Sequence, residues 1–277
     1  MKLNKIIILF AAAAAVTSFA SCGSSRRVAK TETNKEVAIV AHRGFWNCEE
    51  AGYAKNSIAA LVQAQKNGFW GSEFDVNMTS DEELLVFHDS SVEGKKIEKN
   101  PASAFSYYTL KNGEKIPTLD QYLEQGAKSK TMLVLELKTH STDAIEDRAA
   151  ELCVQKLKEH NLFENDRVMF ISFSMNICKK FAELAPGFTV QYLDTDYTTE
   201  QVKAEGVNGI DINYKDLLKD PKRYDQARAN GMSVNSWTVN NKESMMQLID
   251  LGIDQITTDN PLDLRALTQE NGIKEVK

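Results

Sequence analysis

The sequence is poor in cysteine, and the spacing of its cysteines excludes two common kinds of site. Only four occur in 277 residues, at positions 22, 48, 153 and 178. Structural zinc sites need closely spaced cysteine or histidine pairs, and disulfide frameworks usually use an even number of cysteines. Without Cys22, which ends an N-terminal leader-like segment, the other three are odd in number and far apart. Cys153 and Cys178 fall in segments of helical period, where we expect core residues.

The sequence also lacks an excess of positive charge. Its formal net charge is −6, and loss of the leader segment with its two lysines would make it −8. Non-specific binding to nucleic acid depends on a basic surface that neutralises phosphates. The composition therefore predicts that nucleic acid is not a partner.

The apolar run at the N-terminus is too short for a membrane-spanning helix. Residues 1–21 combine two lysines, an alanine-rich apolar stretch and small residues before Cys22, which is the pattern of a secretory signal peptide. Residues 19–22 resemble the lipobox of bacterial lipoproteins, although Phe19 stands where that motif prefers leucine. The resemblance implies that Cys22 becomes a lipidated N-terminus on a membrane of the bacterial cell envelope, on the periplasmic side; the alternative is a plain cleaved signal. Residues 22–35 would then be a flexible tether.

No Gly-x-Gly-x-x-Gly fingerprint follows the first expected strand, which argues against an open dinucleotide-binding sheet. Short apolar runs instead alternate with amphipathic stretches of helical period, eight times in about 240 residues. This alternation is typical of an α/β fold of the (β/α)8 TIM barrel type, here over residues 36–270. The expected strands are residues 36–42, 71–78, 131–138, 167–173, 188–193, 209–214, 232–239 and 255–259.

One segment departs from this rhythm, the stretch GSEFDVNMTSDEELLVFHD at residues 71–89. The turn near residues 80–82 is too short for a crossover helix, so the second run must return antiparallel as a β-hairpin. A two-residue loop would pair Glu73 with His88, and a looser turn would pair Asp75 with His88. Residues 90–117 are rich in turn residues and aromatics, and we expect a small insertion over the barrel mouth.

Carboxylates gather on one face of the expected barrel. Glu73 and Asp75 are two residues apart in a strand and therefore point the same way, as do Glu136 and Lys138 in the third strand. Carboxylates that converge in a barrel repel one another and are costly to desolvate. A divalent cation with hard oxygen ligands would neutralise them, which Lys138 alone would not do. A buried ion-pair network with lysine and arginine is the alternative.

Histidines and cations occupy the ends of the same strands. His42 and Arg43 end the first strand, His88 follows the hairpin, and Lys138 ends the third strand. Beside a cation, this set suits an anionic tetrahedral group, because cations bind its oxygens while one imidazole accepts a proton and the other donates one. The pattern indicates phosphodiester cleavage.

These motifs together resemble the glycerophosphodiester phosphodiesterase family. They are HRG after the first strand, E-x-D in the second, HD after the hairpin, LELK in the third and WTVN near the end, and the resemblance spans about residues 37–265. It implies a calcium- or magnesium-dependent barrel enzyme that converts a small-molecule glycerophosphodiester to glycerol 3-phosphate and an alcohol. The resemblance assigns one cation to Glu73, Asp75 and Glu136, acid–base catalysis to His42 and His88, and the phosphate to Arg43 and Lys138. It leaves open which histidine is the acid, and whether water or the neighbouring glycerol hydroxyl attacks.

The resemblance implies that Trp237 walls the glycerol pocket, although a core tryptophan fits the pattern equally well. Where the family commonly has Pro-Glu-Asn-Thr before the first helix, this chain has Ala-Lys-Asn-Ser at residues 54–57. Asn56 is retained and would serve as a helix N-cap or a polar ligand in the site. Lys55 reverses the charge of the family's acidic residue, and Glu49 and Glu50, in the loop just before, are the candidates to compensate.

Two other functions also fit parts of this pattern. A phospholipase-like enzyme acting on intact lipids or inositol phosphodiesters would use similar residues, and a wide apolar rim at Phe105, Tyr107 and Tyr108 would favour it. A lipoprotein that binds phosphodiesters without cleaving them would be expected to lack a histidine or a metal ligand. None of these residues is missing from the sequence.

Overall fold

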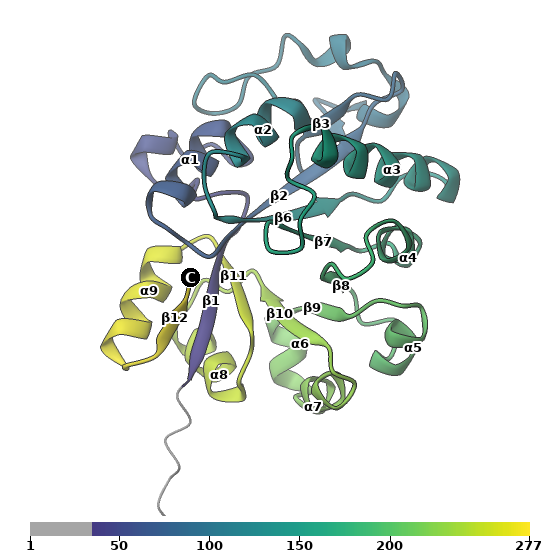
Figure 1. Ribbon diagram of the computed structural model, residues 1–277. Coiled ribbons are helices and arrows are strands. Elements are labelled where there is room, and N and C mark those ends of the chain that lie inside the picture. The colour runs from purple at the N-terminus through teal and green to yellow at the C-terminus, as the bar shows by residue number, and fades with distance from the viewer. Residues whose placement is uncertain (1–34) are drawn as a thin grey trace, which may run out of the picture. The chain divides into compact units, whose positions relative to one another are not determined.

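Eight parallel strands close into a barrel within residues 35–277, the part of the chain that the computed structural model describes (Figure 1). The closing pair joins β1 to β2, through Val40 with Gly71 and Ala41 with Ser72. All eight strands fall within the predicted ranges, which confirms the (β/α)8 fold. The signal peptide, Cys22 and nearly all of the predicted tether lie outside the described residues. The barrel strands, in chain order, are β1 (Glu36–Ala41), β2 (Gly71–Met78), β6 (Met132–Leu137), β7 (Val168–Ser172), β8 (Val190–Tyr192), β9 (Gly209–Asn213), β10 (Ser233–Trp237) and β11 (Gln255–Thr258).

Helices follow the barrel strands and surround the barrel (Figure 1). Seven of the nine α-helices in the described chain begin after a Ser, Thr or Asn whose side chain accepts an N–H of the first turn. No helix within residues 35–277 is long and apolar enough to cross a membrane. The helices are α1 (Ile58–Lys66), α2 (Leu119–Gly126), α3 (Asp143–Glu159), α4 (Met175–Leu184), α5 (Thr199–Ala204), α6 (Tyr214–Lys219), α7 (Lys222–Ala229), α8 (Lys242–Leu251) and α9 (Pro261–Glu270). A last short strand, β12 (Lys274–Val276), pairs with β1.

Alternation along β2 separates the core from the barrel interior. Phe74 stacks on Tyr122 of α2, with ring centroids 4.4 Å apart, so this side chain faces the helices. Glu73 and Asp75 point the opposite way, into the barrel, as the strand period predicts. The whole strand is buried. The charged side chains of Glu73 and Asp75 are therefore buried on the interior face of β2.

The strand β3 (Leu84–Val86) returns antiparallel to β2, but in neither predicted register. Val76 pairs with Val86, and the N–H of Phe87 donates to the carbonyl of Asp75 at 3.0 Å. The residue opposite Asp75 is thus Phe87, not His88. His88 still reaches the site, because the chain leaves the strand after Val86 and bends.

The register follows from a turn longer than expected. Residues 79–83 connect the two strands, with the Thr79 side chain accepting the N–H of Glu83 at 3.0 Å. Glu82 adopts a left-handed conformation, φ 62°, inside this turn. A hydroxyl that bonds locally to the backbone can fix such a turn, and sequence spacing alone did not reveal it.

Residues 90–117 form a small substructure between β3 and α2 (Figure 1). It contains a two-stranded hairpin and two 3-10 helices around an apolar cluster of its own. Phe105 is buried in this cluster, and Tyr108 packs edge-on against Phe87. Only Tyr107 of the three aromatics is well exposed, at 52 %. The wide apolar rim that would favour a lipid-cleaving enzyme is therefore not formed by these residues. The substructure comprises β4 (Ser91–Val92), β5 (Lys95–Lys96), η2 (Ile97–Lys99) and η3 (Ala102–Phe105).

Candidate active site

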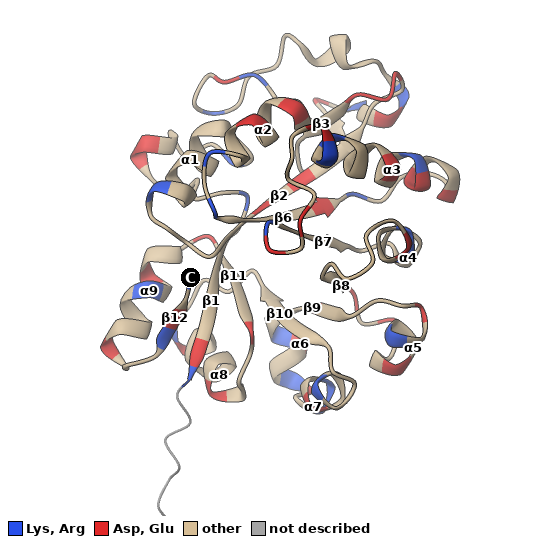
Figure 2. Ribbon diagram, in the orientation of Figure 1, with Lys and Arg blue, Asp and Glu red and all other residues tan. Residues whose placement is uncertain are grey.

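Three carboxylates meet inside the barrel at the ends of β2 and β6. Glu73, Asp75 and Glu136 are all buried, and one oxygen of each lies within 4.8 Å of the others. Asp75 and Glu136 are direct neighbours in the parallel register of the two strands. Figure 2 shows the acidic segments of β2 and β6 side by side. The cluster predicted from strand alternation is therefore present.

The turn after β1 holds Glu73 from the main chain. The N–H of Arg43 donates to Oε2 of Glu73 at 2.7 Å. Arg43 and Gly44 both have positive φ, and a Cβ on Gly44 would lie 2.7 Å from Cβ of Ala60. Only glycine therefore allows this turn to pack against α1. The close turn places the Arg43 amide beside the carboxylate.

The remaining oxygen of Glu73, Oε1, is buried without a hydrogen-bond partner. Burial, together with the charges of Asp75 and Glu136, raises the pKa of Glu73 well above its usual range. Burial and the charge of Asp75 also raise the pKa of Glu136 to about 7. The carboxylate cluster is thus short of positive charge.

Two cations partly neutralise the cluster. Lys138 contacts Glu136 and also Asp75, at 3.2 Å from Oδ1, and Nε of Arg43 lies 3.4 Å from Oδ2 of Asp75. Burial raises the pKa of Asp75, but Lys138 and Arg43 outweigh it and lower the value overall. The predicted alternative, an ion-pair network, is therefore present as well. It leaves three carboxylates facing two cations.

Asn56 belongs to this network. Its Nδ2 donates to Oδ2 of Asp75 at 2.8 Å, and its Oδ1 accepts the backbone N–H of Asp75 at 3.2 Å. The N-cap of α1 is Ser57, whose hydroxyl accepts the N–H of Ala60, so the expectation of Asn56 as the N-cap is wrong. Asn56 also has a positive φ of 58°. The structure makes it a partner of the site carboxylate.

His42 is fixed by a residue that the sequence did not single out. Its Nδ1 lies 2.8 Å from Oδ1 of Asp259, directly after β11, and its Nε2 lies 4.0 Å from Glu73. Trp46 and Asn240 donate to the same carboxylate at 2.9 and 2.7 Å. Burial raises the pKa of Asp259, but the bond to His42 and the other donors lower it to about 2. Asp259 is ionised and accepts a hydrogen bond from the Nδ1–H group of His42. The other ring nitrogen, Nε2, therefore faces the site.

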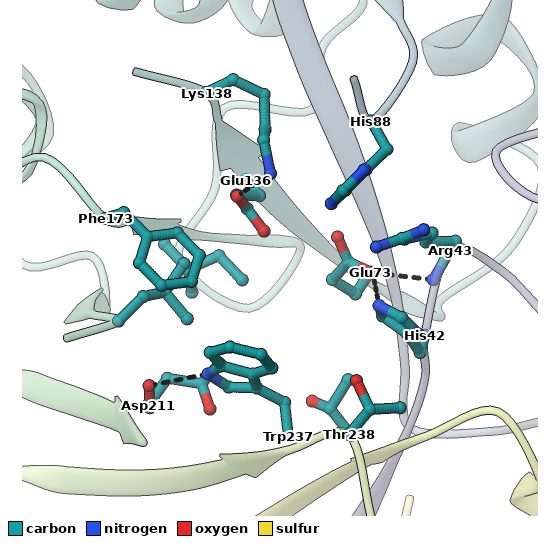
Figure 3. A pocket seen from close by; sticks show the side chains of 13 residues that line it. His42, Arg43, Glu73, His88, Glu136, Lys138, Phe173, Asp211, Trp237 and Thr238 are labelled. Atoms are coloured by element: carbon teal, nitrogen blue, oxygen red, sulfur yellow. Dashed lines mark hydrogen bonds and ion pairs between the residues drawn. The ribbon is translucent and has the colours of Figure 1, made fainter. Parts of the chain in front are cut away.

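His88 lines the same pocket, across Glu73 and Arg43 from His42 (Figure 3). Its Nδ1 is 2.6 Å from Oδ1 of Asp89, and Asn77 anchors the preceding loop by donating to the carbonyl of Phe87 at 2.7 Å. Burial lowers the pKa of His88, while the charge of Asp75 opposes that change.

The other two histidines lie apart from the site. His140 is buried and accepts the backbone N–H of Met78 at 3.0 Å. His160 follows α3 and pairs with Asp120. His140 lies in the loop after β6, and His160 is the C-cap residue of α3.

A pocket of about 530 Å³, part of it open to solvent, joins these groups (Figure 3). Trp237 lines it and packs edge-on against Phe173, with ring centroids 5.4 Å apart. Its indole N–H donates to the carbonyl of Asp211 at 3.0 Å. Trp237 is therefore part of a pocket wall. The lining residues are His42, Arg43, Glu73, His88, Glu136, Lys138, Ile171, Phe173, Leu193, Asp211, Trp237, Thr238 and Thr257.

Lys55 is exposed and lies against Trp46, with Nζ 4.5 Å from the ring centroid. Within residues 35–277 it forms no ion pair with Glu49 or Glu50. The compensation expected from those two acids is therefore absent. A cation on an indole face is stabilised by the ring instead.

Comparison with known proteins gives consistent results. The sequence model of the glycerophosphoryl diester phosphodiesterase family matches residues 42–263. A glycerophosphodiester phosphodiesterase from Caldanaerobacter subterraneus is 26 % identical over 255 residues, which cover 86 % of this chain and all of that protein. The crystal structure of a glycerophosphodiester phosphodiesterase from Parabacteroides distasonis is similar, with a TM-score of 0.82 and 38 % identity, over 86 % of this chain and 99 % of that one. An Oleispira antarctica phosphodiesterase, solved with its product sn-glycerol-3-phosphate, shares the fold with a TM-score of 0.72 and 24 % identity, over 84 % of this chain and 96 % of that one.

Proposed function

The chain belongs to the glycerophosphoryl diester phosphodiesterase family, and we propose that it cleaves glycerophosphodiesters with a divalent cation and a pair of histidines. The products are glycerol 3-phosphate and an alcohol. The observation that carries the proposal is that His42 and His88 line one pocket together with Glu73 and Glu136, two of the three converging carboxylates. Both imidazoles have Nδ1 bonded to a carboxylate, which leaves Nε2 of each for the substrate.

The carboxylate cluster fits a hard cation. Glu73, Asp75 and Glu136 offer oxygen ligands within 4.8 Å of one another, and Oε1 of Glu73 is buried without a partner. Oxygen donors of this kind suit Ca²⁺ or Mg²⁺. When bound, the cation would neutralise the excess negative charge and polarise a phosphoryl oxygen.

Arg43 and Lys138 are the groups that bind the phosphate in this proposal. Both line the pocket, and both already contact carboxylates there. Lysine and arginine bind phosphate oxygens through charge-assisted hydrogen bonds. They would orient the phosphorus between the two histidines.

The two imidazoles divide the proton transfers. Nε2 of His42 takes the proton of the attacking hydroxyl as its oxygen bonds to phosphorus, and Asp259 stabilises the imidazolium that forms. The bond from phosphorus to the leaving oxygen breaks, and His88 donates its Nε2 proton to that oxygen from its doubly protonated form, which burial opposes and the charge of Asp75 favours. His42 is assigned as the base because Asp259, with a pKa of about 2, holds its Nδ1 proton. Water as the attacking group gives glycerol 3-phosphate in this one step. The neighbouring glycerol hydroxyl would instead give a cyclic phosphate, which water opens in a second step with the two histidines exchanging roles.

We also propose that residues 1–21 are removed and that Cys22 becomes a lipid anchor on the periplasmic side of a bacterial membrane. The support is the leader-like composition and the lipobox-like residues 19–22. Mass spectrometry of the N-terminal peptide should find acyl groups on Cys22. A Cys22→Ala variant should appear in the soluble fraction, and unmodified Cys22 in the native protein would refute the anchor.

The activity is tested by measuring glycerol 3-phosphate release from glycerophosphocholine and glycerophosphoethanolamine. The purified protein is assayed with EDTA and then with Ca²⁺ or Mg²⁺ restored. Release that stops in EDTA and returns with metal is the expected result. No release with either metal would overturn the proposal.

A further inference from the structure

Asp211 is a fourth acidic group in the barrel interior, and neither the cation nor the acid–base scheme uses it. It lies in β9, is 1 % exposed and lines the pocket. Its Oδ2 accepts from Nδ2 of Asn235 at 3.0 Å. Its Oδ1 is buried with no hydrogen-bond partner. One half of a buried carboxyl is therefore unsatisfied.

Among residues 35–277, no lysine, arginine or histidine forms an ion pair with this carboxyl. The two cations of the pocket, Arg43 and Lys138, contact Asp75 and Glu136 instead. Burial and the charge of Glu136 raise the pKa of Asp211 well above its usual range. A buried polar group without a partner loses its hydrogen bonds to water and gains none in return. A functional site can contain such an unpaired group when a bound ligand supplies the missing hydrogen bond.

The position of Asp211 indicates which part of a ligand it meets. It lies beside Trp237 on the wall opposite Glu73 and His42 (Figure 3). The rest of this wall is mainly apolar, with Ile171 and Leu193. A phosphate bound by Arg43 and Lys138 would direct its esterified carbon chain towards this wall. Asp211 is the acidic side chain that the ligand's carbon chain would meet on this wall.

We propose that Asp211 forms a hydroxyl-binding subsite, which recognises the glycerol half of the substrate. A hydroxyl both donates and accepts a hydrogen bond, so it satisfies Oδ1 whether the carboxyl is ionised or protonated. Asn235 and the indole of Trp237 fix the residue from two sides. Buried polar groups aimed at a hydroxyl discriminate strongly against analogues that lack it, because the group is then left unpaired. The inference rests on the proposed function and names the residue that would select glycerol esters.

The test compares two ligands that differ only in hydroxyl groups, glycerol 3-phosphate and propyl phosphate. Dissociation constants are measured by calorimetry on the metal-loaded protein, so turnover is not needed. The native protein should bind glycerol 3-phosphate more tightly by about 10- to 100-fold, the range for a hydrogen bond to a charged group. In Asp211→Leu, affinity for glycerol 3-phosphate should fall by that factor while affinity for propyl phosphate changes less than about threefold. Asp211→Asn keeps a hydrogen-bond acceptor, so its affinity for glycerol 3-phosphate should fall less than that of Asp211→Leu.

The control variant is Gln191→Met. Gln191 also has a buried oxygen without a partner in the barrel interior, but it does not line the pocket. This variant should leave the ratio of the two affinities unchanged. Thermal unfolding of each variant checks that it is folded, and Asp211→Asn carries the test if Asp211→Leu does not fold.

Two results would overturn the subsite. One is equal affinity of the native protein for the two ligands. The other is an equal loss for both ligands in the Asp211 variants, since that would indicate a structural role such as binding an internal water. Failure of the proposed function has a different signature, which is native protein that releases no glycerol 3-phosphate from any glycerophosphodiester.

Discussion

Nδ1 of His42 and Oδ1 of Asp259 are 2.8 Å apart, although 217 residues separate them in the sequence. The barrel closure brings them together, because β1 and β11 are paired neighbours. The carboxylate fixes one tautomer of the imidazole and points its other nitrogen at the pocket. His42 therefore acts with a partner, in the way that a general base is commonly oriented by a second group.

Replacing Asp259 with asparagine tests this partnership. Loss of the charge should lower kcat by about 100- to 1000-fold, within the range of acid–base effects. The carboxylate stabilises the imidazolium, so its removal should lower the pKa of His42 further below 6.5, where burial has already moved it. The acid limb of the profile of kcat/KM against pH should shift to lower pH. If the Asp259→Asn variant kept full activity and an unshifted acid limb, Asp259 would not orient the base.

The two histidines should be catalytic without being structural. We expect His42→Ala and His88→Ala each to reduce turnover by about two to four orders of magnitude, with metal binding retained. His160→Ala is the matched control, because His160 pairs with Asp120 away from the pocket, and it should keep full activity. Full activity in a His42→Ala, His88→Ala double variant would end the proposed mechanism.

The carboxylate cluster should make stability depend on metal. A cation that binds only the folded state raises the melting temperature, and the rise grows with the logarithm of the cation concentration above its dissociation constant. The native protein should therefore melt at a higher temperature with Ca²⁺ or Mg²⁺ than with EDTA. In Glu136→Gln this shift should shrink, and a large excess of metal should partly restore both the shift and the activity. Glu146→Gln removes a buried acid outside the cluster and should keep the native shift. Equal shifts in both variants would exclude Glu136 as a ligand.

The turn after β1 should tolerate only glycine at position 44. Gly44→Ala adds a Cβ at 2.7 Å from Ala60, at a φ of +76°, so both strain and collision oppose it. We expect the melting temperature to fall by more than about 5 °C, with loss of activity as the Arg43 amide moves from Glu73. Gly94→Ala has a φ of +80° and open space around it, so it reports strain alone and should cost about 2–4 °C. An equal loss in both variants would show that Ala60 yields to the new methyl group.

The sequence predicted the barrel because its signals are local. Each strand is an apolar run between helical segments, and the two-residue period of a strand was enough to bring Glu73, Asp75 and Glu136 together. Motif order placed His42 and His88 at strand ends of the same rim, where the pocket has them. Local patterns of this kind need no knowledge of tertiary distances.

What the sequence did not reveal depends on details of turns and on contacts across the barrel. The hairpin register was missed because a Thr79 hydroxyl fixes a longer turn. Asp259 and Asp211 were missed because their partners lie on other strands. One signal was available, since an acidic residue ends the eighth strand at the rim where catalytic groups gather. Lys55 was singled out correctly as a departure, but its contact with Trp46 required the structure.

The closure of the barrel gives the pocket a mechanical role. Two residue pairs join β1 to β2, and the turn at Gly44 adds one further main-chain bond to Glu73. His42 and Arg43 stand on one side of this seam, and the carboxylates stand on the other. A phosphate and a cation bound between the two groups would link β1 to β2 across this junction. Amide hydrogen exchange in β1 and β2 should therefore slow when the ligand binds. Without ligand, the barrel should unfold locally first between these two strands, at the active site.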